Sequence, residues 1–169
     1  MNGDEESGLD TLIAEAAVSR LIARYATMTD WMDWAGMPTL FSADADIDFG
    51  GMFRGTPAEF MPFVSELEGG YDRRMHLFGM PRIDVSGATA RAECASITHV
   101  RTKGAAHHDD AIFYGRYIFT AGKIEGAWKL TRLAFYLNAA SASQAPAGDE
   151  GPINLADAFH PGHSDMAQG

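Results

Sequence analysis

The sequence predicts an α+β fold, in which helices gather on one side of an antiparallel sheet. Patterns typical of helices lie within residues 9–67, whereas residues 75–138 contain long runs typical of strands. The 169 residues suit one domain with a sizeable core, and the hydrophobic share of 46% is ordinary for a globular protein. The sequence contains no internal repeat that would indicate a solenoid or a second domain.

A first helix is predicted from Leu9 to about Thr29, because apolar residues recur there close to every 3.6 residues. Residues 1–8 are polar and acidic, and we expect them to form a disordered tail. Asp30 and Asp33 are candidate N-caps for a short second helix. The apolar residues of that helix would be Trp34, Met37, Leu40 and Phe41.

A half-buried strand is predicted at residues 45–49, where apolar and acidic side chains alternate before a glycine pair. A third helix is predicted from Thr56 to about Leu67. Thr56 can cap it, Pro57 suits its first position, and Glu59 completes a capping box.

The rest of the chain is rich in strand patterns. The runs typical of strands are 75–85, 89–102, 111–120 and 128–138. The polar stretch 103–110, which contains His107-His108-Asp109-Asp110, is predicted to be a loop. Residues 139–169 are rich in Ala, Ser, Gly and Pro, which predicts an irregular C-terminal tail after a single domain at 9–138.

The charge, the cysteine count and the hydropathy of the sequence limit its expected partners and location. A formal net charge of −10 disfavours nucleic acid, which needs clustered cationic side chains. Cys94 is the single cysteine, so no intrachain disulfide can form. The first residues lack the pattern of a signal peptide, and no apolar stretch approaches the length of a membrane span. We therefore expect a cytoplasmic protein without a membrane partner.

Three segments carry a resemblance to a known family. The sequence RYATMTDWMDW at residues 24–34 leads into LFSADADIDF, RMHLFG follows at 74–79, and GAWKLTRL lies at 126–133. In this order and at these intervals, they resemble motifs of the SnoaL-like, or nuclear-transport-factor-2-like (NTF2-like), superfamily. The resemblance implies a cystatin-like cone, in which a curved antiparallel sheet wraps around N-terminal helices and encloses a pocket. It also implies an enzyme without a cofactor and a homo-oligomer, either a dimer or a trimer.

Within that superfamily the chain resembles the lyase-like members, which include scytalone dehydratase, bile-acid 7α-dehydratase and hexachlorocyclohexane dehydrochlorinase. These members pair an Asp at the end of the first helix with a His on the first long strand, and Asp30 and His76 match those positions. Tyr25 matches an active-site Tyr of the bile-acid enzyme, and His99 resembles a second His of scytalone dehydratase. The resemblance thus implies Asp30, His76 and Tyr25 as catalytic residues.

Such a pair can abstract a proton from carbon without a metal. Histidine has an ordinary pKa of about 6.5, close to working pH. Asp30 would accept the other ring N–H of His76 and stabilise the imidazolium that forms. Tyr25 and Asp30 are five residues apart, or about 140° around one helix, so they converge only if the helix ends before Asp30.

Several further residues are candidates for binding a hydrophobic cyclic substrate. They are His99, Arg132, Trp34, Phe49, Phe78 and Tyr117. No metal site is predicted. His107 and His108 are adjacent, and adjacent side chains on a strand point to opposite faces, so an exposed loop is expected there. His160 and His163 lack a convincing partner set for zinc.

Structural interpretations stand beside these functional ones. Asp30 can be a helix cap, His76 and Tyr25 can be core residues, and His99 and Arg132 can face the surface. At the level of function, the leading hypothesis is a lyase or isomerase, and the sequence does not separate elimination from isomerisation or cyclisation. The alternatives are a binding module without catalysis and the small β subunit of a ring-hydroxylating dioxygenase.

Overall fold

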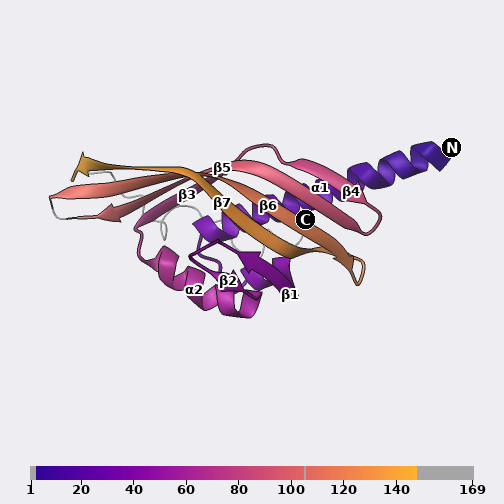
Figure 1. The fold of residues 1–169 in the computed structure, drawn as a ribbon, viewed down its shortest axis with the longest axis horizontal. Helices are drawn as coiled ribbons and strands as arrows, with labels where there is room; N and C mark the ends of the chain where they lie inside the picture. The colour runs from indigo at the N-terminus through magenta and orange to yellow at the C-terminus, as the bar shows by residue number, and fades with distance from the viewer. Residues whose placement is uncertain (1–2, 105, 148–169) are drawn as a thin grey trace.

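The computed structural model describes residues 3–104 and 106–147 of the chain (Figure 1). Two α-helices and one 3₁₀ turn account for its helical content: α1 at Gly3–Asp30, η1 at Met37–Leu40 and α2 at Pro57–Gly69. The strands are β1 at Phe41–Asp48, β2 at Arg54–Gly55, β3 at Arg73–Phe78, β4 at Arg82–Ser86, β5 at Thr89–Lys103, β6 at His107–Ile124 and β7 at Ala127–Pro146.

The strands form one curved, open sheet in the order β2-β1-β7-β6-β5-β3, with β4 paired to β5 beside β3. The α+β class is therefore confirmed. The sheet is mixed, however, because β1 and β7 run parallel while the other pairs are antiparallel. The long excursion from β1 through α2 and β3 to β6 allows the last strand to return beside β1 in the same direction.

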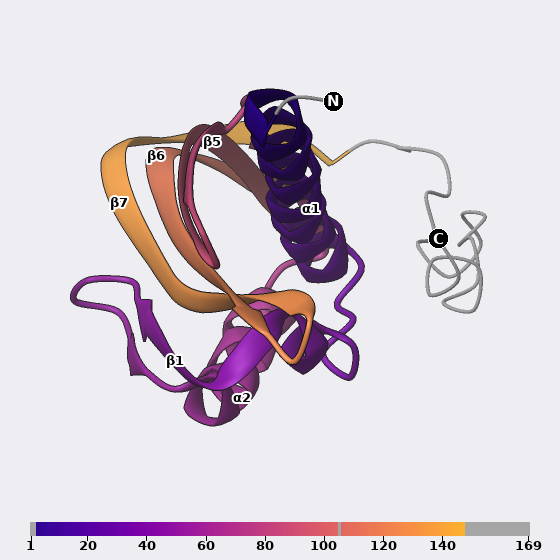
Figure 2. The same ribbon diagram turned by 90° about the vertical axis from the view of Figure 1, so that its right-hand side faces the viewer.

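The concave side of the sheet holds the core. Figure 2 shows the strands from β5 to β1 curling around a space that α1 borders on one side, with α2 near β1. Alternate residues of β5 are buried, from Ala90 through Cys94 to Val100, as expected for a strand with one face on the core. Val18, Ile22 and Tyr25 of α1 are buried in the same core cluster.

The bend of the sheet depends on two irregularities between β6 and β7. The strand register shifts near Gly115 and again near Thr120, and such bulges increase local curvature. Gly115 also gives the Phe135 ring room on the concave face, because a Cβ there would lie 2.3 Å from Phe135 Cε2.

The start of α2 is as the sequence predicts. The capping box at the start of α2 is present, with the Thr56 main-chain N–H donating to Glu59 Oε2 at 2.8 Å. The predicted second helix is only the single turn η1, and Asp33 holds the chain before it by accepting a hydrogen bond from the Gly36 N–H.

Several predicted boundaries are wrong. Helix α1 begins at Gly3, so residues 3–8 are not a disordered tail. The run 75–85 divides into β3 and β4, because Pro81 and its neighbours leave the ladder. The polar stretch from His107 belongs to β6, and β7 extends to Pro146.

The extension of β6 and β7 has a simple cause. The two strands pair with each other over residues 107–114 and 139–146, so their main-chain hydrogen bonds do not depend on apolar side chains. The remainder of the predicted tail, residues 148–169, lies outside the described residues.

None of the described helices combines the length and the apolar character that crossing a membrane requires.

Candidate active site

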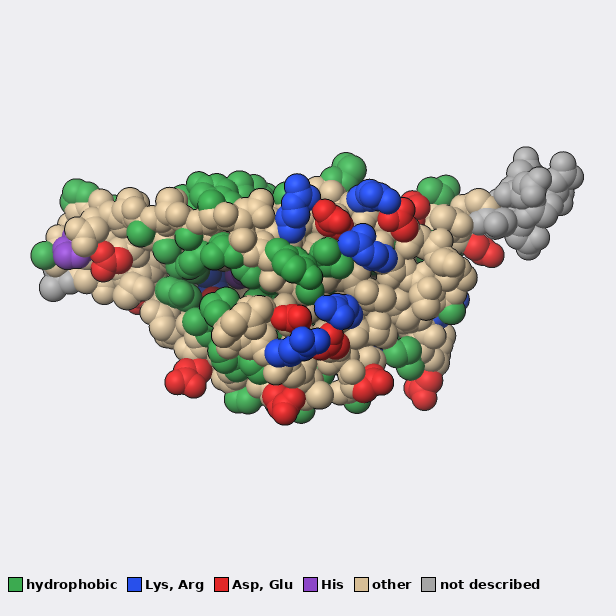
Figure 3. Space-filling view, in the orientation of Figure 1, with side chains coloured by type: hydrophobic (Ala, Val, Ile, Leu, Met, Phe, Trp, Pro, Cys, Tyr) green, Lys and Arg blue, Asp and Glu red, His purple; other side chains and the backbone are tan. Residues whose placement is uncertain are grey.

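A cavity of about 500 Å³ opens between α1, α2, the β1–β2 turn and the concave face of the sheet. Figure 3 shows a hollow rimmed by hydrophobic side chains between the sheet and α2. Most of its lining is aromatic or aliphatic. The lining residues are Tyr25, Thr29, Phe49, Gly50, Gly51, Met52, Phe60, Phe63, Val64, Leu67, Glu68, Tyr71, His76, Thr98, Val100, Phe113, Tyr117, Phe135, Tyr136 and Leu137.

Asp30 and His76 meet at one end of this cavity. Asp30 is the last residue of α1, and His76 lies in the middle of β3. The His76 main-chain N–H lies 3.0 Å from both oxygens of the Asp30 carboxylate, and His76 Nδ1 is 2.7 Å from Oδ1. The His76 side chain is only 5% exposed.

This geometry determines the tautomer of His76. A carboxylate can only accept, so Nδ1 carries the proton that it shares with Asp30. No hydrogen bond to Nε2 is found among the described residues, and His76 lines the cavity. Nε2 is therefore the ring atom available to a bound ligand.

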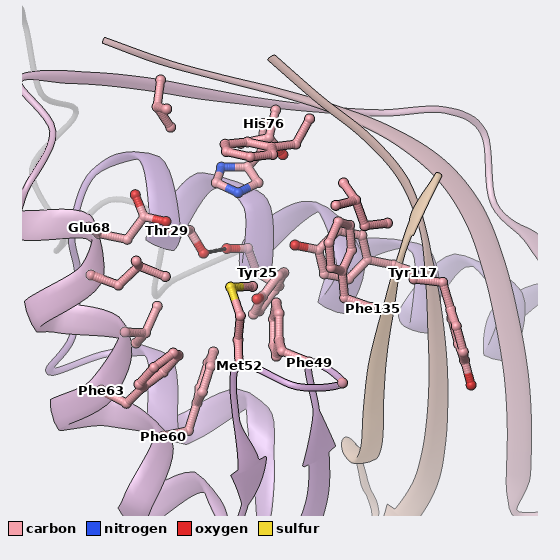
Figure 4. Close-up of a pocket in the computed structure, with 18 of the residues that line it drawn as sticks. Tyr25, Thr29, Phe49, Met52, Phe60, Phe63, Glu68, His76, Tyr117 and Phe135 are labelled. Atoms are coloured by element: carbon pink, nitrogen blue, oxygen red, sulfur yellow. Dashed lines mark hydrogen bonds between the residues drawn. The ribbon is translucent and has the colours of Figure 1, made fainter. Parts of the chain in front are cut away.

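Tyr25 lies in the cavity wall together with Tyr117 and Thr29 (Figure 4). Its hydroxyl interacts with the hydroxyls of Tyr117 and Thr29, and burial raises the pKa of both tyrosines. Both phenols therefore stay neutral and can donate hydrogen bonds.

Tyr25 and Asp30 do not converge directly. Helix α1 runs unbroken through Asp30, so the condition for their convergence is not met. Asp30 lies behind His76, which lines the cavity with Tyr25.

The aromatic candidates divide into two groups. Phe49 and Tyr117 line the cavity. Phe78 and Trp34 are partly buried residues that pack against the core, and neither lines the cavity. Phe78 stacks against Tyr25, with the ring centroids 6.3 Å apart and an interplanar angle of 12°, so it supports the cavity wall from behind.

Two charged candidates lie away from the cavity, contrary to the prediction. Thr98 and Val100 of β5 line it, so His99 between them points to the outer face of the sheet and lies 3.4 Å from Asp110. Arg132 of β7 forms an ion pair with Asp46 of β1 at 3.0 Å and is 40% exposed.

Glu68 is a cavity residue that the sequence analysis missed. It is 7% exposed, and its Oε2 accepts a 3.0 Å hydrogen bond from Arg74 Nε. Burial raises the pKa of the Glu68 carboxyl, although the nearby His76 and Arg74 act in the opposite direction. A carboxyl group with a raised pKa in an apolar cavity is a candidate acid.

These features lie within a recognised domain. The SnoaL-like domain family matches residues 10–134 of the sequence. The chain belongs to this family. No curated protein sequence matches it significantly.

Solved structures agree with the SnoaL-like assignment. A Novosphingobium aromaticivorans protein provisionally named scytalone dehydratase has 22% identity and a TM-score of 0.69, covering 85% of this chain and 95% of its own. A hexachlorocyclohexane dehydrochlorinase from Novosphingobium barchaimii has 16% identity and a TM-score of 0.73, covering 80% and 94%. An NTF2-like protein with a cystatin-like fold from Novosphingobium aromaticivorans has 21% identity and a TM-score of 0.61, covering 79% and 87%. At such identities the likeness establishes the fold and not the reaction.

A sequence signal for Glu68 in this SnoaL-like chain does exist. Phe60, Val64 and Glu68 are spaced four residues apart and form the buried stripe of α2. The predicted helix ends at about Leu67, one residue before the carboxyl that completes this stripe.

Metal-ligating side chains and the single cysteine were the other candidates for chemistry in this SnoaL-like domain. Within residues 3–104 and 106–147, no three His, Cys, Asp or Glu side chains are grouped so that they could hold a metal ion. Burial raises the pKa of the Cys94 thiol to about 11, which keeps it protonated at neutral pH. His160 and His163 lie outside the described residues.

Proposed function

We propose that this SnoaL-like protein is a lyase or isomerase that acts on a hydrophobic cyclic small molecule and uses His76 as its base. The observation that carries the proposal is the Asp30–His76 pair, whose 2.7 Å hydrogen bond orients a buried imidazole at the end of an apolar cavity. The names of two structural neighbours, a dehydratase and a dehydrochlorinase, support elimination chemistry.

The reaction begins with proton abstraction from a carbon next to a carbonyl group of the substrate. His76 Nε2 takes the proton, and the Asp30 carboxylate stabilises the imidazolium through Nδ1. Tyr25 and Tyr117, which stay neutral, can donate hydrogen bonds to the negative charge that develops on the substrate oxygen. These proton transfers and hydrogen bonds use neither a metal nor an organic cofactor.

The cavity indicates the class of substrate. Its volume of about 500 Å³ and its aromatic lining suit a ring system with few polar groups. Apart from the tyrosines, the polar lining residues are Thr29, Glu68, His76 and Thr98, which come from α1, α2, β3 and β5. A ligand with one or two oxygen functions near His76 therefore matches the distribution of polar side chains.

Replacing the two paired residues tests the proposal. Asp30→Asn and His76→Ala should each reduce turnover of cyclic β-hydroxy ketones by about 10²–10⁴-fold, because an oriented general base contributes that much. Formation of the enone is followed by its ultraviolet absorbance, and circular dichroism checks that the variants fold. Full activity in both variants would remove the base from the mechanism.

A second candidate function is ligand binding without turnover. The His76 main-chain N–H also donates to the Asp30 carboxylate, so the pair additionally ties the end of α1 to β3. A purely structural pair would leave a bound ligand chemically unchanged. Mass spectrometry of the ligand before and after incubation with the protein separates the two functions.

We also propose that the protein is a homo-oligomer, because the outer face of the sheet exposes apolar side chains. Leu77, Ile97 and Tyr114 are exposed apolar residues in neighbouring register on β3, β5 and β6, with Met75 beside them. Contiguous exposed apolar surface of this kind is typical of protein interfaces. Analytical ultracentrifugation should find a dimer or trimer, and a monomer at all concentrations would contradict the proposal.

A further inference from the structure

Glu68 lies at the same end of the cavity as the proposed base. Figure 4 shows Glu68 and His76 together there, with Thr29 beside them. Glu68 comes from α2, whereas His76 comes from β3, so the two groups approach the cavity from different elements. A ligand in the cavity therefore meets an imidazole and a carboxyl group at one end.

Arg74 holds the Glu68 carboxyl in place. Arg74 is a buried cation with a side chain 2% exposed, and its Nε donates to Glu68 Oε2. Its Nη2 also donates to the main-chain oxygens of Glu68 and Tyr71, each at 2.7 Å. No hydrogen bond to Oε1 is recorded within the described part of the chain. One oxygen is thus anchored while the other remains for a ligand.

The surroundings of Glu68 raise its pKa on balance. Burial raises its pKa most strongly, and the negative charge of Asp30 raises it further, while His76 and Arg74 lower it. The other ionisable side chains that sense its charge are Tyr25, Tyr71 and Tyr117.

We propose that Glu68 is a catalytic general acid, which gives its proton to a departing hydroxide of the substrate. The inference rests on the proposed elimination and extends it, because it identifies the leaving group as hydroxide. A halide or another weakly basic group departs as a stable anion and needs no proton. Hydroxide departs from carbon readily only when it is protonated as it leaves.

The proton balance of the step is complete. His76 Nε2 accepts the proton of the C–H bond, whose electron pair forms the new C=C bond. The C–O bond breaks, its electron pair goes to oxygen, and the Glu68 proton converts that oxygen to water. The imidazolium proton of His76 then returns to the Glu68 carboxylate, directly or through water, and both groups regain their starting forms.

Two probes with the same product test this assignment. Elimination from 3-hydroxycyclohexanone releases water, and elimination from 3-(4-nitrophenoxy)cyclohexanone releases 4-nitrophenolate, while both give the same cyclohexenone. Glu68→Gln should slow the hydroxy probe by about 10²-fold or more, because general acid catalysis contributes that much. The nitrophenoxy probe should keep a rate close to that of the wild-type protein.

The pH profile gives an independent readout. With the wild-type protein, the rate on the hydroxy probe should fall as pH rises through the raised pKa of Glu68, because the acid is lost there. The nitrophenoxy probe should lack this alkaline limb, and so should Glu68→Gln with either probe.

Controls separate failure of this inference from failure of the proposed function. Glu66→Gln makes the same change at an exposed position of α2 and should leave both rates unaltered. Equal slowing of both probes by Glu68→Gln, or slowing of neither, overturns the role of Glu68 while the base at His76 stands. Full activity of His76→Ala, or no enone from either probe with the wild-type protein, overturns the proposed function itself. If Glu68→Gln does not fold, Glu68→Asp takes its place, since a shorter acid should also slow the hydroxy probe selectively.

Discussion

Two His–Asp pairs lie on opposite faces of the same sheet, and they differ in ways that matter for chemistry. On the concave face, His76 Nδ1 is 2.7 Å from Asp30, and the His76 side chain is 5% exposed. On the outer face, His99 Nε2 is 3.4 Å from Asp110, and the His99 side chain is 30% exposed. The residue types are the same, but only His76 lines the cavity.

The partners of the two carboxylates differ as well. Asp110 binds the Arg101 guanidinium with both oxygens, at 2.5 and 2.6 Å, and this hydrogen-bonded cation lowers the pKa of Asp110. Asp30 instead receives the main-chain N–H and the ring N–H of His76. The other ligands of the carboxylate, and the space beside the imidazole, therefore determine what a His–Asp pair can do.

The largest expected effect is a loss of turnover in variants of the concave His–Asp pair and not in variants of the outer pair. His76→Ala should lose about 10²–10⁴-fold in rate, because the proposed general base is removed. His99→Ala and Asp110→Asn should keep the rate of the wild-type protein, since both residues lie on the outer face. Steady-state kinetics on the cyclic hydroxy ketones measures all three variants. A comparable loss of turnover in His99→Ala or Asp110→Asn would mean that residues on the outer face also affect the reaction in the cavity.

A second prediction tests how the concave face keeps its shape. Gly115→Ala places a Cβ 2.3 Å from Phe135 Cε2 and 2.8 Å from the main-chain oxygen of Tyr136. We expect it to lower the free energy of unfolding by about 1–3 kcal/mol and to weaken ligand binding, because Phe135 must move. Chemical denaturation measures the first effect.

Gly122→Ala is the matched control on the same strand. The nearest atom to its added Cβ is the Thr131 methyl group at 3.3 Å, so a smaller loss of stability is expected. Equal losses of stability in the two variants would show that the position of the Phe135 ring does not depend on Gly115.

The smallest expected effect concerns the pH dependence of stability on the concave face. Burial raises the pKa of Glu68 above 4.5, so the folded protein keeps this proton at pH values where the unfolded chain has released it. Stability should therefore decline as pH rises from 4.5 through the pKa in the folded state. Glu68→Gln removes this term and should gain in stability relative to the wild-type protein over that range.

Urea denaturation at a series of pH values measures the difference between the two proteins. Glu66→Gln provides the control. The stability gain with rising pH should occur in Glu68→Gln and not in Glu66→Gln. On the outer face the sign is opposite, because Asp110 has a lowered pKa and its contribution is lost as pH falls below 3.8. A flat difference for Glu68 would indicate that folding leaves the pKa of its carboxyl unchanged.

Local patterns in the sequence predicted much of this fold correctly. The capping box at Thr56 and Glu59, the periodicity of α1 and the alternation in β1 all depend on neighbours within a few residues. The ends of β6 and β7 could not be predicted in this way. Their polar and small side chains resemble those of loops, and the strands exist because each pairs with the other along its main chain.

The sequence by itself determined the α+β class, the resemblance to the SnoaL-like family and the identity of the two residues that pair as Asp30 and His76. Only the tertiary structure decided that His99 and Arg132 face outward, that Phe78 lies behind Tyr25, and that Glu68 enters the cavity. The physical reason is that the side of a strand or helix facing the cavity is set by the pairing register and by packing between elements far apart in the chain.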